Sequence, residues 1–304
     1  MTRKYLANVS VVCLISASCI PYSSATDLVE TQYLSTPNKI YHAGDKYPRI
    51  KVATYNIAGG LRNHTVNIAL VSEAIMKLNP DIITLEEVDQ GTARSHGLDQ
   101  AKEIARKTGM YYSFGKSLDM EGGSYGNAIL SKFPIEKTMV FKLPSGSEEP
   151  RSLMISKINV PGFDAAVYVY NSHFDWREDD TVRMAQARFI NSIVFDDRDL
   201  DKVLPNLATG ITILMGDFNS VKSDRVTKEI GKYWQLVDVI GTDTRTWPAG
   251  NPGLDLDHIF TGKGQKWIIE KLTIPNDGKE AFGIKWQTVS DHIPVMATMK
   301  LVEQ

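Results

Sequence analysis

The sequence predicts a single α/β domain in which helices cover mixed β-sheets. Short apolar runs typical of strands recur along the chain, and segments with helical periodicity lie between several of them. From Arg49 onward, neither a long linker nor an internal repeat interrupts this order. Adjacent strand-like runs with intervening helices are typical of layered α/β proteins, so periodicity alone gives the fold class.

The first 25 residues have the layout of a secretory signal peptide. Two cations, Arg3 and Lys4, precede an apolar segment at 9–20, and small residues follow it up to Ala25. A membrane span needs about 20 apolar residues, whereas this run is shorter and rich in serine. We therefore expect cleavage near Ala25 and export to the periplasm or the outside of the cell, rather than a lipid anchor at Cys19.

Charge and cysteine content limit the chemistry of the exported chain. Both cysteines, Cys13 and Cys19, lie inside the predicted leader, so catalysis by a thiol is not expected. The formal net charge is -2, and loss of Arg3 and Lys4 would make it -4. A mildly acidic chain lacks the basic surface expected of a broad nucleic-acid binder. A metal site, however, concentrates carboxylates that a bound cation offsets, so the net charge does not exclude a nucleic-acid substrate.

The chain after the leader divides into a lead-in at 26–48, which has no clear periodicity, and one domain at 49–304. Helices are predicted at 65–80, 98–109 and 179–194. Strands are predicted at 49–57, 81–88, 126–135, 153–160, 165–174, 211–220, 234–240, 256–262 and 291–301.

The helix at 179–194 carries the most specific packing prediction. Asp179 or Asp180 is expected to cap its first turn. The apolar side chains at helical spacing are expected to face the core. They are Val182, Ala185, Phe189 and Ile193.

Many of the predicted strands begin or end in polar side chains. Each one alone is an ordinary turn former, but their recurrence at so many strand ends favours a shared site. Asp217 and Asn219 illustrate the pattern, because side chains two residues apart in an extended chain face the same side. The full set comprises Asn56, Glu86, Glu87, Asn171, His173, Asp217, Asn219, Asp257, His258, Asp291 and His292.

These residue types suit metal-assisted phosphoester hydrolysis. A hard cation such as Mg²⁺ binds carboxylate oxygens, water and substrate phosphate, and asparagine amides can hold a phosphate oxygen. Hydrolysis also needs an activated water and an aid to the leaving group, which a histidine paired with a carboxylate can supply near neutral pH. The sequence shows no Ser-His-Asp elbow, glycine-rich nucleotide loop or Cys/His zinc spacing that would favour another chemistry.

An ordered set of short motifs resembles the endonuclease/exonuclease/phosphatase superfamily, which includes enzymes like deoxyribonuclease I. The motifs are TYNI, DIITLEEVD, GNAILSKFPI, NSHFD, MGDFNS, LDHIF and SDHIPV, and the resemblance covers roughly residues 49–301. It implies a four-layer α/β sandwich with two packed mixed sheets flanked by helices, and an active site at one edge. The chain looks most like bacterial members described as metal-dependent hydrolases.

The resemblance implies catalytic roles for five residues. Asp217 matches the residue that orients or deprotonates the attacking water, and Asn219 matches its neighbour that steadies the transition state. His173 matches a histidine that acts at the phosphate in pancreatic-type deoxyribonucleases and bacterial sphingomyelinases. His292 matches the terminal catalytic histidine, and Asp257 the acidic residue that pairs with it.

The resemblance also implies a metal site. Glu87 matches the metal-binding carboxylate, and Asn56 and Asp291 match residues near the metal and phosphate. Mg²⁺ is the expected ion, with Mn²⁺ as an alternative. Two positions depart from the family pattern: Glu86 stands where glutamine is common, and His258 where tyrosine is frequent.

Two arginines are candidates for substrate binding. Arg151 lies near a position that contacts phosphate in the deoxyribonucleases, although a surface ion pair with Glu148 or Glu149 explains it equally well. Arg94 either lines the cleft or decorates a loop, and the cleft is the interpretation we favour.

These implications describe an exported metal-dependent phosphoester hydrolase that uses in-line attack by water. A phosphodiesterase or nuclease is the first interpretation, and a sphingomyelinase or inositol-phospholipid phosphatase is the alternative. A non-catalytic binding module on the same fold is less consistent with a complete set of catalytic positions. Trp247 could insert into a lipid surface, but we expect it to pack down on a Pro/Gly turn. We expect a monomer whose partner is a phosphoester, in a nucleic acid or a phospholipid head group.

Overall fold

The computed structural model describes residues 27–29, 47–62, 65–193, 204, 207–276 and 281–303. The predicted leader, with Ala25 and Cys19, lies outside the described residues. In the lead-in, Asp27–Val29 forms β1, which pairs antiparallel with β8 (Ile135–Lys142) at a sheet edge. No strand was predicted in the lead-in, because its sequence has no clear periodicity. None of the described helices is long and apolar enough to cross a membrane.

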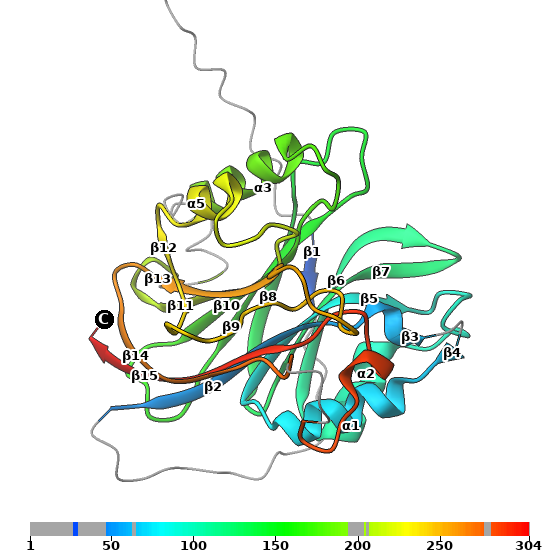
Figure 1. Ribbon diagram of the computed structural model, residues 1–304, viewed down its shortest axis with the longest axis horizontal. Coiled ribbons are helices and arrows are strands. Elements are labelled where there is room, and N and C mark those ends of the chain that lie inside the picture. The colour runs from blue at the N-terminus through cyan, green and yellow to red at the C-terminus, as the bar shows by residue number, and fades with distance from the viewer. Residues whose placement is uncertain are drawn as a thin grey trace, which may run out of the picture.

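Two large mixed sheets and flanking helices form the structure, which confirms the predicted fold class (Figure 1). The seven-stranded sheet has the order β1-β8-β9-β10-β11-β13-β12, and the six-stranded sheet the order β14-β15-β2-β5-β7-β6. The seven-stranded sheet is completed by β9 (Ser152–Ile158), β10 (Val167–His173), β11 (Ile211–Asp217), β12 (Trp234–Leu236) and β13 (Asp257–Gly262). The other contains β2 (Arg49–Asn56), β5 (Ile82–Gln90), β6 (Tyr111–Met120), β7 (Gly123–Ser131), β14 (Lys266–Thr273) and β15 (Val295–Glu303).

Helices cover the outer face of each sheet, as Figure 1 shows. Helices α1 (Ile68–Leu78) and α2 (Gln100–Thr108) share an apolar cluster with the six-stranded sheet. Helices α3 (Thr181–Ile193) and α5 (Arg225–Ile230) do the same on the seven-stranded sheet. Short elements connect these parts: η1 (Ala58–Gly60), β3 (Leu61–Arg62), β4 (Thr65–Val66), η2 (Leu207–Thr209) and η3 (Trp286–Thr288).

The layer between the two sheets changes from apolar to polar along the strands. Val169 on β10 and Met215 on β11 belong to the buried cluster that joins the sheets. Because alternate side chains of a strand share a face, the same row continues to Asn171 and His173 on β10 and to Asp217 on β11. Strands β10 and β11 are paired in parallel, and at their ends His173 lies beside Asp217.

Asn171 connects the two sheets through hydrogen bonds rather than joining the cluster at the strand ends. Its side chain is fully buried, and its Nδ2 donates to the backbone oxygens of Leu85 on β5 (3.1 Å) and Ala128 on β7 (2.9 Å). These two residues pair next to a bulge in β5, where the β5–β7 ladder is interrupted before Val88. The amide therefore satisfies carbonyl groups beside the bulge that water cannot reach.

The predicted inward face of α3 is correct in part, because Ile193 is buried and Phe189 packs against the apolar cluster of the seven-stranded sheet. Val182, Ala185 and Phe189 are half-buried, and only Ile193 of the predicted face is fully buried. Polar side chains share the inner face with Ala187, Ile190 and Ile193, because the polar side chains bind the loop that follows β10. Gln186 accepts a hydrogen bond from the backbone N–H of Asp175 (3.0 Å). The buried residues of this helix are Arg183, Gln186, Ala187, Ile190, Asn191 and Ile193.

The first turn of α3 agrees with the predicted acidic cap. The carboxylate of Asp179 accepts hydrogen bonds from the backbone N–H (2.9 Å) and the hydroxyl (2.7 Å) of Thr181. The pKa of Asp179 is lowered by these hydrogen bonds. This end of the helix is therefore anchored beside the polar edge of the two sheets.

We expect Asn171→Ala to destabilise the fold by about 2–3 kcal/mol, because it removes the hydrogen bonds that two buried carbonyl groups accept from this side chain. Urea unfolding would measure the loss. Asn251→Ala, which removes an exposed amide, is the matched control and is expected to change stability little. Equal unfolding midpoints for the two variants would contradict the role of Asn171 as a link between the sheets.

Candidate active site

A cleft of about 350 Å³ lies where the polar edge of the inter-sheet layer reaches the surface. Nine of the ten site residues predicted from the sequence lie in its wall or directly behind it, and this grouping joins strand ends far apart in the chain. The cleft is lined by Glu87, Arg151, His173, Trp176, Asp217, Asn219, Trp247, Leu254, Leu256, Asp291 and His292.

The carboxylate of Asp217 is the centre of this cluster. Its Oδ2 accepts a hydrogen bond from Asn56 Nδ2 on the opposite sheet (2.9 Å) and lies 3.6 Å from Nε2 of both His173 and His292. Its Oδ1 accepts the backbone N–H of Asn219 (2.9 Å). Four parts of the chain therefore meet at one buried carboxylate, which is 1% exposed.

Gly216 allows β10 and β11 to come this close just before the site. A Cβ atom at this position would lie 1.9 Å from the carbonyl oxygen of Ser172 on β10. No side chain fits at that distance, so glycine is required there. The contact keeps the ends of the two strands in register.

Burial is the main reason why the Asp217 carboxyl differs from an ordinary aspartate. Desolvation and the nearby charge of Asp257 raise the pKa of Asp217 to about 7, although His292 and the hydrogen bonds from Asn56 and Asn219 oppose the increase. A carboxylate with this pKa can accept a proton near neutral pH. Asp217 therefore has the position and the basicity to activate a water in the cleft.

His292 is held by Asp257, the residue predicted to pair with it. The distance from His292 Nδ1 to Asp257 Oδ2 is 2.9 Å, and both side chains are buried. Burial alone would lower the pKa of His292, but the charges of Asp257 and Asp217 raise it to about 10. The ring is therefore an imidazolium near neutral pH and can donate from Nε2 into the cleft.

His173 has the opposite electrostatic environment. Burial, together with the positive charges of Arg151 and His292, holds the pKa of His173 well below its usual value. Arg151 lies 2.9 Å from His173 Nδ1 and can only donate, so the neutral ring carries its proton on Nε2. Asn219 Nδ2 lies 3.2 Å from this Nε2 and donates to the backbone oxygen of Phe174. The two histidines thus differ in charge.

Arg151 has features of both interpretations of its sequence position, although its side chain is buried and not at the surface. It lines the cleft, and it also forms an ion pair with Glu149 at 3.1 Å. The side chain is 4% exposed, so its orientation is fixed by these partners. The guanidinium of Arg151 can therefore contact a substrate phosphate only through the side that faces the cleft.

A bulge in β5 brings Glu87 to the cleft. The β5–β7 register shifts between Leu85 and Val88, and Glu87 has a φ of 57°. Non-glycine residues seldom adopt this conformation, which is common at functional sites. Glu86 then points between the sheets, where it accepts a hydrogen bond from Thr54 (3.2 Å). Glu87 turns toward Asn56, whose Nδ2 donates to its Oε1 (3.1 Å).

Two groups of side chains could hold a cation. Asp217, Asp257 and His292 offer ligand atoms within 4.8 Å of one another, but His292 Nδ1 is already bonded to Asp257. Glu87 and Asp291 both line the cleft, and burial, then the charge of Asp291, raise the pKa of Glu87. Such a pair of hard oxygen donors fits a divalent ion such as Mg²⁺ better than the mixed group does.

Arg94 does not belong to the described lining of the cleft. It forms two hydrogen bonds with the buried carboxylate of Asp89, at 2.7 and 2.8 Å, and its guanidinium lies 5.4 Å from the centre of the Tyr125 ring. The guanidinium of Arg94 is thus held by Asp89 beside the described cleft wall, near enough to Glu87 for the charge of Glu87 to raise the pKa of Arg94. Asp89 needs a buried cationic partner, and Arg94 fulfils that need.

The apolar part of the cleft was not predicted. Trp176, Leu254 and Leu256 line it, and so does Trp247, which is 37% exposed instead of packed beneath a turn. The expectation for Trp247 was wrong because its hairpin stands beside the cleft. The one available signal was Trp176 itself, a large aromatic residue placed among charged residues in HFDWRED.

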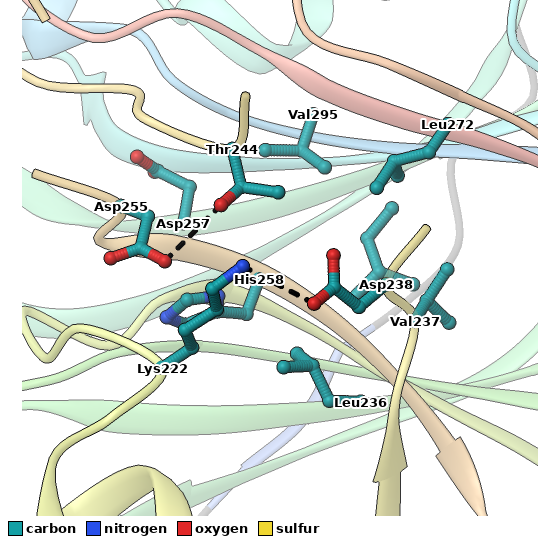
Figure 2. Close-up of a pocket in the computed structure, with 11 residues that line it drawn as sticks. Lys222, Leu236, Val237, Asp238, Thr244, Asp255, Asp257, His258, Leu272 and Val295 are labelled. Atoms are coloured by element: carbon teal, nitrogen blue, oxygen red, sulfur yellow. Dashed lines mark hydrogen bonds and ion pairs between the residues drawn. The ribbon is translucent and has the colours of Figure 1, made fainter. Parts of the chain in front are cut away.

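His258 faces a second, smaller pocket behind the start of β13, which Figure 2 shows. Lys222 pairs with Asp238 there (3.2 Å), and Thr244 donates to Asp255 (3.2 Å). Nε2 of His258 lies 2.8 Å from the backbone oxygen of Ser220. The pocket has room for about one water molecule, about 10 Å³, so it does not compete with the cleft as a substrate site.

Comparisons with known proteins agree with this geometry. A model of the endonuclease/exonuclease/phosphatase family matches residues 53–292. The uncharacterized protein YbhP of Escherichia coli strain K12 is 25% identical over 264 residues, which cover 83% of this chain and 96% of YbhP.

Solved structures share the fold at lower identity. A functionally unknown conserved protein from Enterococcus faecalis V583 has a TM-score of 0.66 at 20% identity, covering 84% of this chain and 100% of that one. A mannosyl-6-phosphatase from Bacteroides thetaiotaomicron VPI-5482 has a TM-score of 0.60 at 17% identity, covering 83% and 99%.

We expect Asp257→Asn to lower the pKa of His292 from about 10 by at least about 1 pH unit, because a major charge that raises it is removed. Titration of the His292 ring followed by NMR would measure the change. A raised histidine pKa stabilises the fold below the unfolded value of about 6.5 and loses that contribution as pH rises through the folded value. The loss of stability in the variant should therefore be greatest below about pH 6.5, and its difference from the wild type should shrink to nothing as pH rises to about 10. Asp119→Asn, at an exposed site, is the control, and an equal His292 pKa in both variants would contradict the pairing.

Proposed function

Because this chain belongs to the endonuclease/exonuclease/phosphatase family, whose members hydrolyse phosphoester bonds, we propose that it is an exported, divalent-metal-dependent phosphodiesterase. The observation that carries the proposal is the buried Asp217 carboxylate, with a pKa of about 7, between two histidines and two asparagines at the base of a cleft. Family membership gives the reaction class, and this cluster supports a working site.

Water activation is the task of Asp217. A water in the cleft donates a hydrogen bond to the carboxylate and loses its proton to it as the oxygen attacks phosphorus in line. Asn56 and the backbone N–H of Asn219 hold the two carboxylate oxygens in place. Fixing the base in this way reduces the reorganisation needed when the proton moves.

The histidines and Asn219 stabilise the charge that develops on the phosphoryl oxygens. His292, charged through its pair with Asp257, donates from Nε2, and neutral His173 donates from its own Nε2. Arg151 keeps His173 in the required tautomer. The proton for the leaving oxygen comes from the charged His292 ring, because neutral His173 has no proton acidic enough to transfer.

Glu87 and Asp291 would hold the divalent ion, with Asn56 supporting Glu87. When bound, Mg²⁺ or Mn²⁺ neutralises charge on the phosphate and so lowers the barrier to attack. Glu87 is pre-aligned for this role by the bulge and by its hydrogen bond to Asn56, before any ion arrives.

A phosphodiester is the substrate class that the charge of the cleft favours. A diester carries one negative charge at phosphorus, and among the described residues of the cleft wall Arg151 is the one lysine or arginine. A monoester with two charges calls for more cationic groups. One fold relative is a mannosyl-6-phosphatase, and the phosphodiester proposal distinguishes this chain from it.

A lipid phosphodiester is the second candidate. The exposed Trp247 and Leu254 at the cleft support it, because apolar side chains beside an active site can contact a lipid surface.

The proposal that the protein is exported rests on the leader at 1–25. N-terminal sequencing of the secreted protein is expected to show that the mature chain starts at Thr26. A chain that still begins at Met1 would contradict export by this route.

We expect purified protein to hydrolyse a phosphodiester in Mg²⁺ and to lose this activity in EDTA. A dinucleotide, plasmid DNA, RNA, sphingomyelin and a phosphoinositide would be assayed in parallel. Asp217→Asn, which keeps the size of the side chain, is expected to lower kcat by about 10²–10⁴-fold, because the base is lost. Asp119→Asn should retain full activity, since that side chain is exposed. The absence of turnover with every substrate and metal would favour a non-catalytic binding module.

We expect Glu87→Gln to raise the Mg²⁺ concentration for half-maximal activity by about 10-fold or more, because a charged oxygen ligand becomes neutral. Activity at saturating Mg²⁺ should recover further than in Asp217→Asn, which loses the base itself. Isothermal calorimetry with Mg²⁺ gives the same comparison without turnover. Unchanged Mg²⁺ affinity would show that the ion binds elsewhere, for example at Asp217, Asp257 and His292.

A further inference from the structure

Exposed large apolar side chains are concentrated at the candidate active site. Eight such residues occur in the described part of the chain, and three of them, Trp176, Trp247 and Leu254, line the one cleft that contains Asp217. The remaining five are Met76, Tyr233, Ile240, Ile268 and Phe282. Exposed tryptophans that lie together in a catalytic cleft indicate a binding role, because exposing an apolar ring to water does not stabilise the protein.

We propose that Trp176, Trp247 and Leu254 form a subsite for a planar ring carried by the substrate, so that the enzyme acts on small nucleotide-like phosphodiesters. The inference rests on the proposed function, because it names the substrate class of the same site. A nucleobase or an aryl ring is the group that fits, since an indole offers a flat apolar face on which such rings stack.

Trp176 stands on a loop that is held in place from three sides. Its neighbour Asp175 is fully buried and donates its backbone N–H to Gln186 on α3 (3.0 Å). Arg177 pairs with Asp175 and with Glu148 (2.7 Å), and its guanidinium lies 5.9 Å from the centre of the Trp176 ring. The tryptophan is nevertheless 64% exposed, so its anchored backbone presents a largely open ring.

The polar inner face of α3 is explained by the same loop. Arg183 is buried and donates to the backbone oxygens of Asp175 (3.2 Å) and Arg177. A helix that only packed against the sheet would use apolar residues at these positions. The buried arginine and glutamine therefore serve to fix the loop that carries Trp176.

Trp247 and Leu254 belong to a hairpin attached to the opposite part of the site. They form a backbone bridge, with Trp247 N–H donating to Leu254 O (3.0 Å) and Leu254 N–H donating to Trp247 O (2.9 Å). The hairpin is tied to the segment of Asp291 and His292, since Ala249 N–H donates to Asp291 O (2.7 Å). The apolar residues are thus fixed relative to the candidate metal ligand and the catalytic histidine.

The charge of the cleft excludes a long nucleic acid as the best substrate. Proteins that hold DNA or RNA place rows of lysine and arginine along the backbone. The described cleft wall contains one such residue, Arg151, and it is largely buried and paired with Glu149. Two tryptophans with a single arginine instead match a ligand with one or two phosphates and a ring, and about 350 Å³ is within the range of small-molecule sites.

The test compares two ligands that differ only in the base: adenosine 5′-monophosphate and ribose 5-phosphate. Binding to the purified full-length protein in Mg²⁺ would be measured by calorimetry. The nucleotide is expected to bind about 5- to 100-fold more tightly, since stacking on aromatic side chains contributes that much. Trp176→Ala and Trp247→Ala should each reduce this ratio and leave ribose 5-phosphate binding unchanged, whereas Trp176→Phe should retain most of it.

Ile240→Ala, which removes a fully exposed apolar residue outside the cleft, is the control and should not change the ratio. Equal affinities for the two ligands in the wild type, or a ratio unaffected by both tryptophan variants, would overturn the inference. So would tryptophan-dependent binding to sphingomyelin vesicles without preference for the nucleotide, because the subsite would then serve a lipid surface.

The binding ratio does not depend on turnover, so phosphodiester hydrolysis with no base preference would refute the subsite alone. A base preference without any hydrolysis would refute the proposed function alone.

Discussion

The burial of one carboxylate, that of Asp217, is the constraint on which the rest of the site depends. A charged group at 1% exposure needs hydrogen-bond donors, and these come from both sheets and from the loop at Asn219. Asn56 belongs to the six-stranded sheet and Asp217 to the seven-stranded sheet. Their 2.9 Å hydrogen bond therefore joins the two sheets at the polar end of the sandwich. The same burial gives Asp217 its raised pKa, so fold and chemistry share one cause.

Two residues beside this carboxylate have backbone conformations that side chains rarely adopt. Glu87 has a φ of 57° in the bulge of β5, and Asn219 a φ of 46° directly after β11. A regular β5 would point Glu87 away from the site, and a regular continuation of β11 would lead Asn219 out of reach of the Asp217 carboxylate. The hydrogen bonds of Asn56 and Asp217 stabilise both conformations. Two of the seven non-glycine residues with positive φ in the described part of the chain thus lie at strand ends that hold candidate catalytic groups.

The sequence predicted the layered fold and the membership of the polar cluster, because both depend on local patterns. Continuous apolar runs marked β10 and β11, and their polar ends marked His173 and Asp217. Features that depend on distant partners were missed. Arg94 forms an ion pair with the buried carboxylate of Asp89. Arg183 and Gln186 of α3 are buried because they bind the loop after β10, and Trp247 is exposed because of where its hairpin lies. None of these follows from periodicity, since each is decided by what lies across the fold.

The central claim is that deprotonated Asp217 activates the attacking water, and the pH dependence of kcat/KM in Mg²⁺ tests it most directly. With a pKa raised to about 7 by burial and Asp257, and lowered to some extent by a bound cation, Asp217 should impose a single acidic limb. The account predicts that kcat/KM falls about tenfold per pH unit below this pKa, and that the residual activity of Asp217→Asn lacks that limb. A kcat/KM that stays constant from about pH 5 to 8, or an acidic limb that persists unchanged in Asp217→Asn, would contradict it.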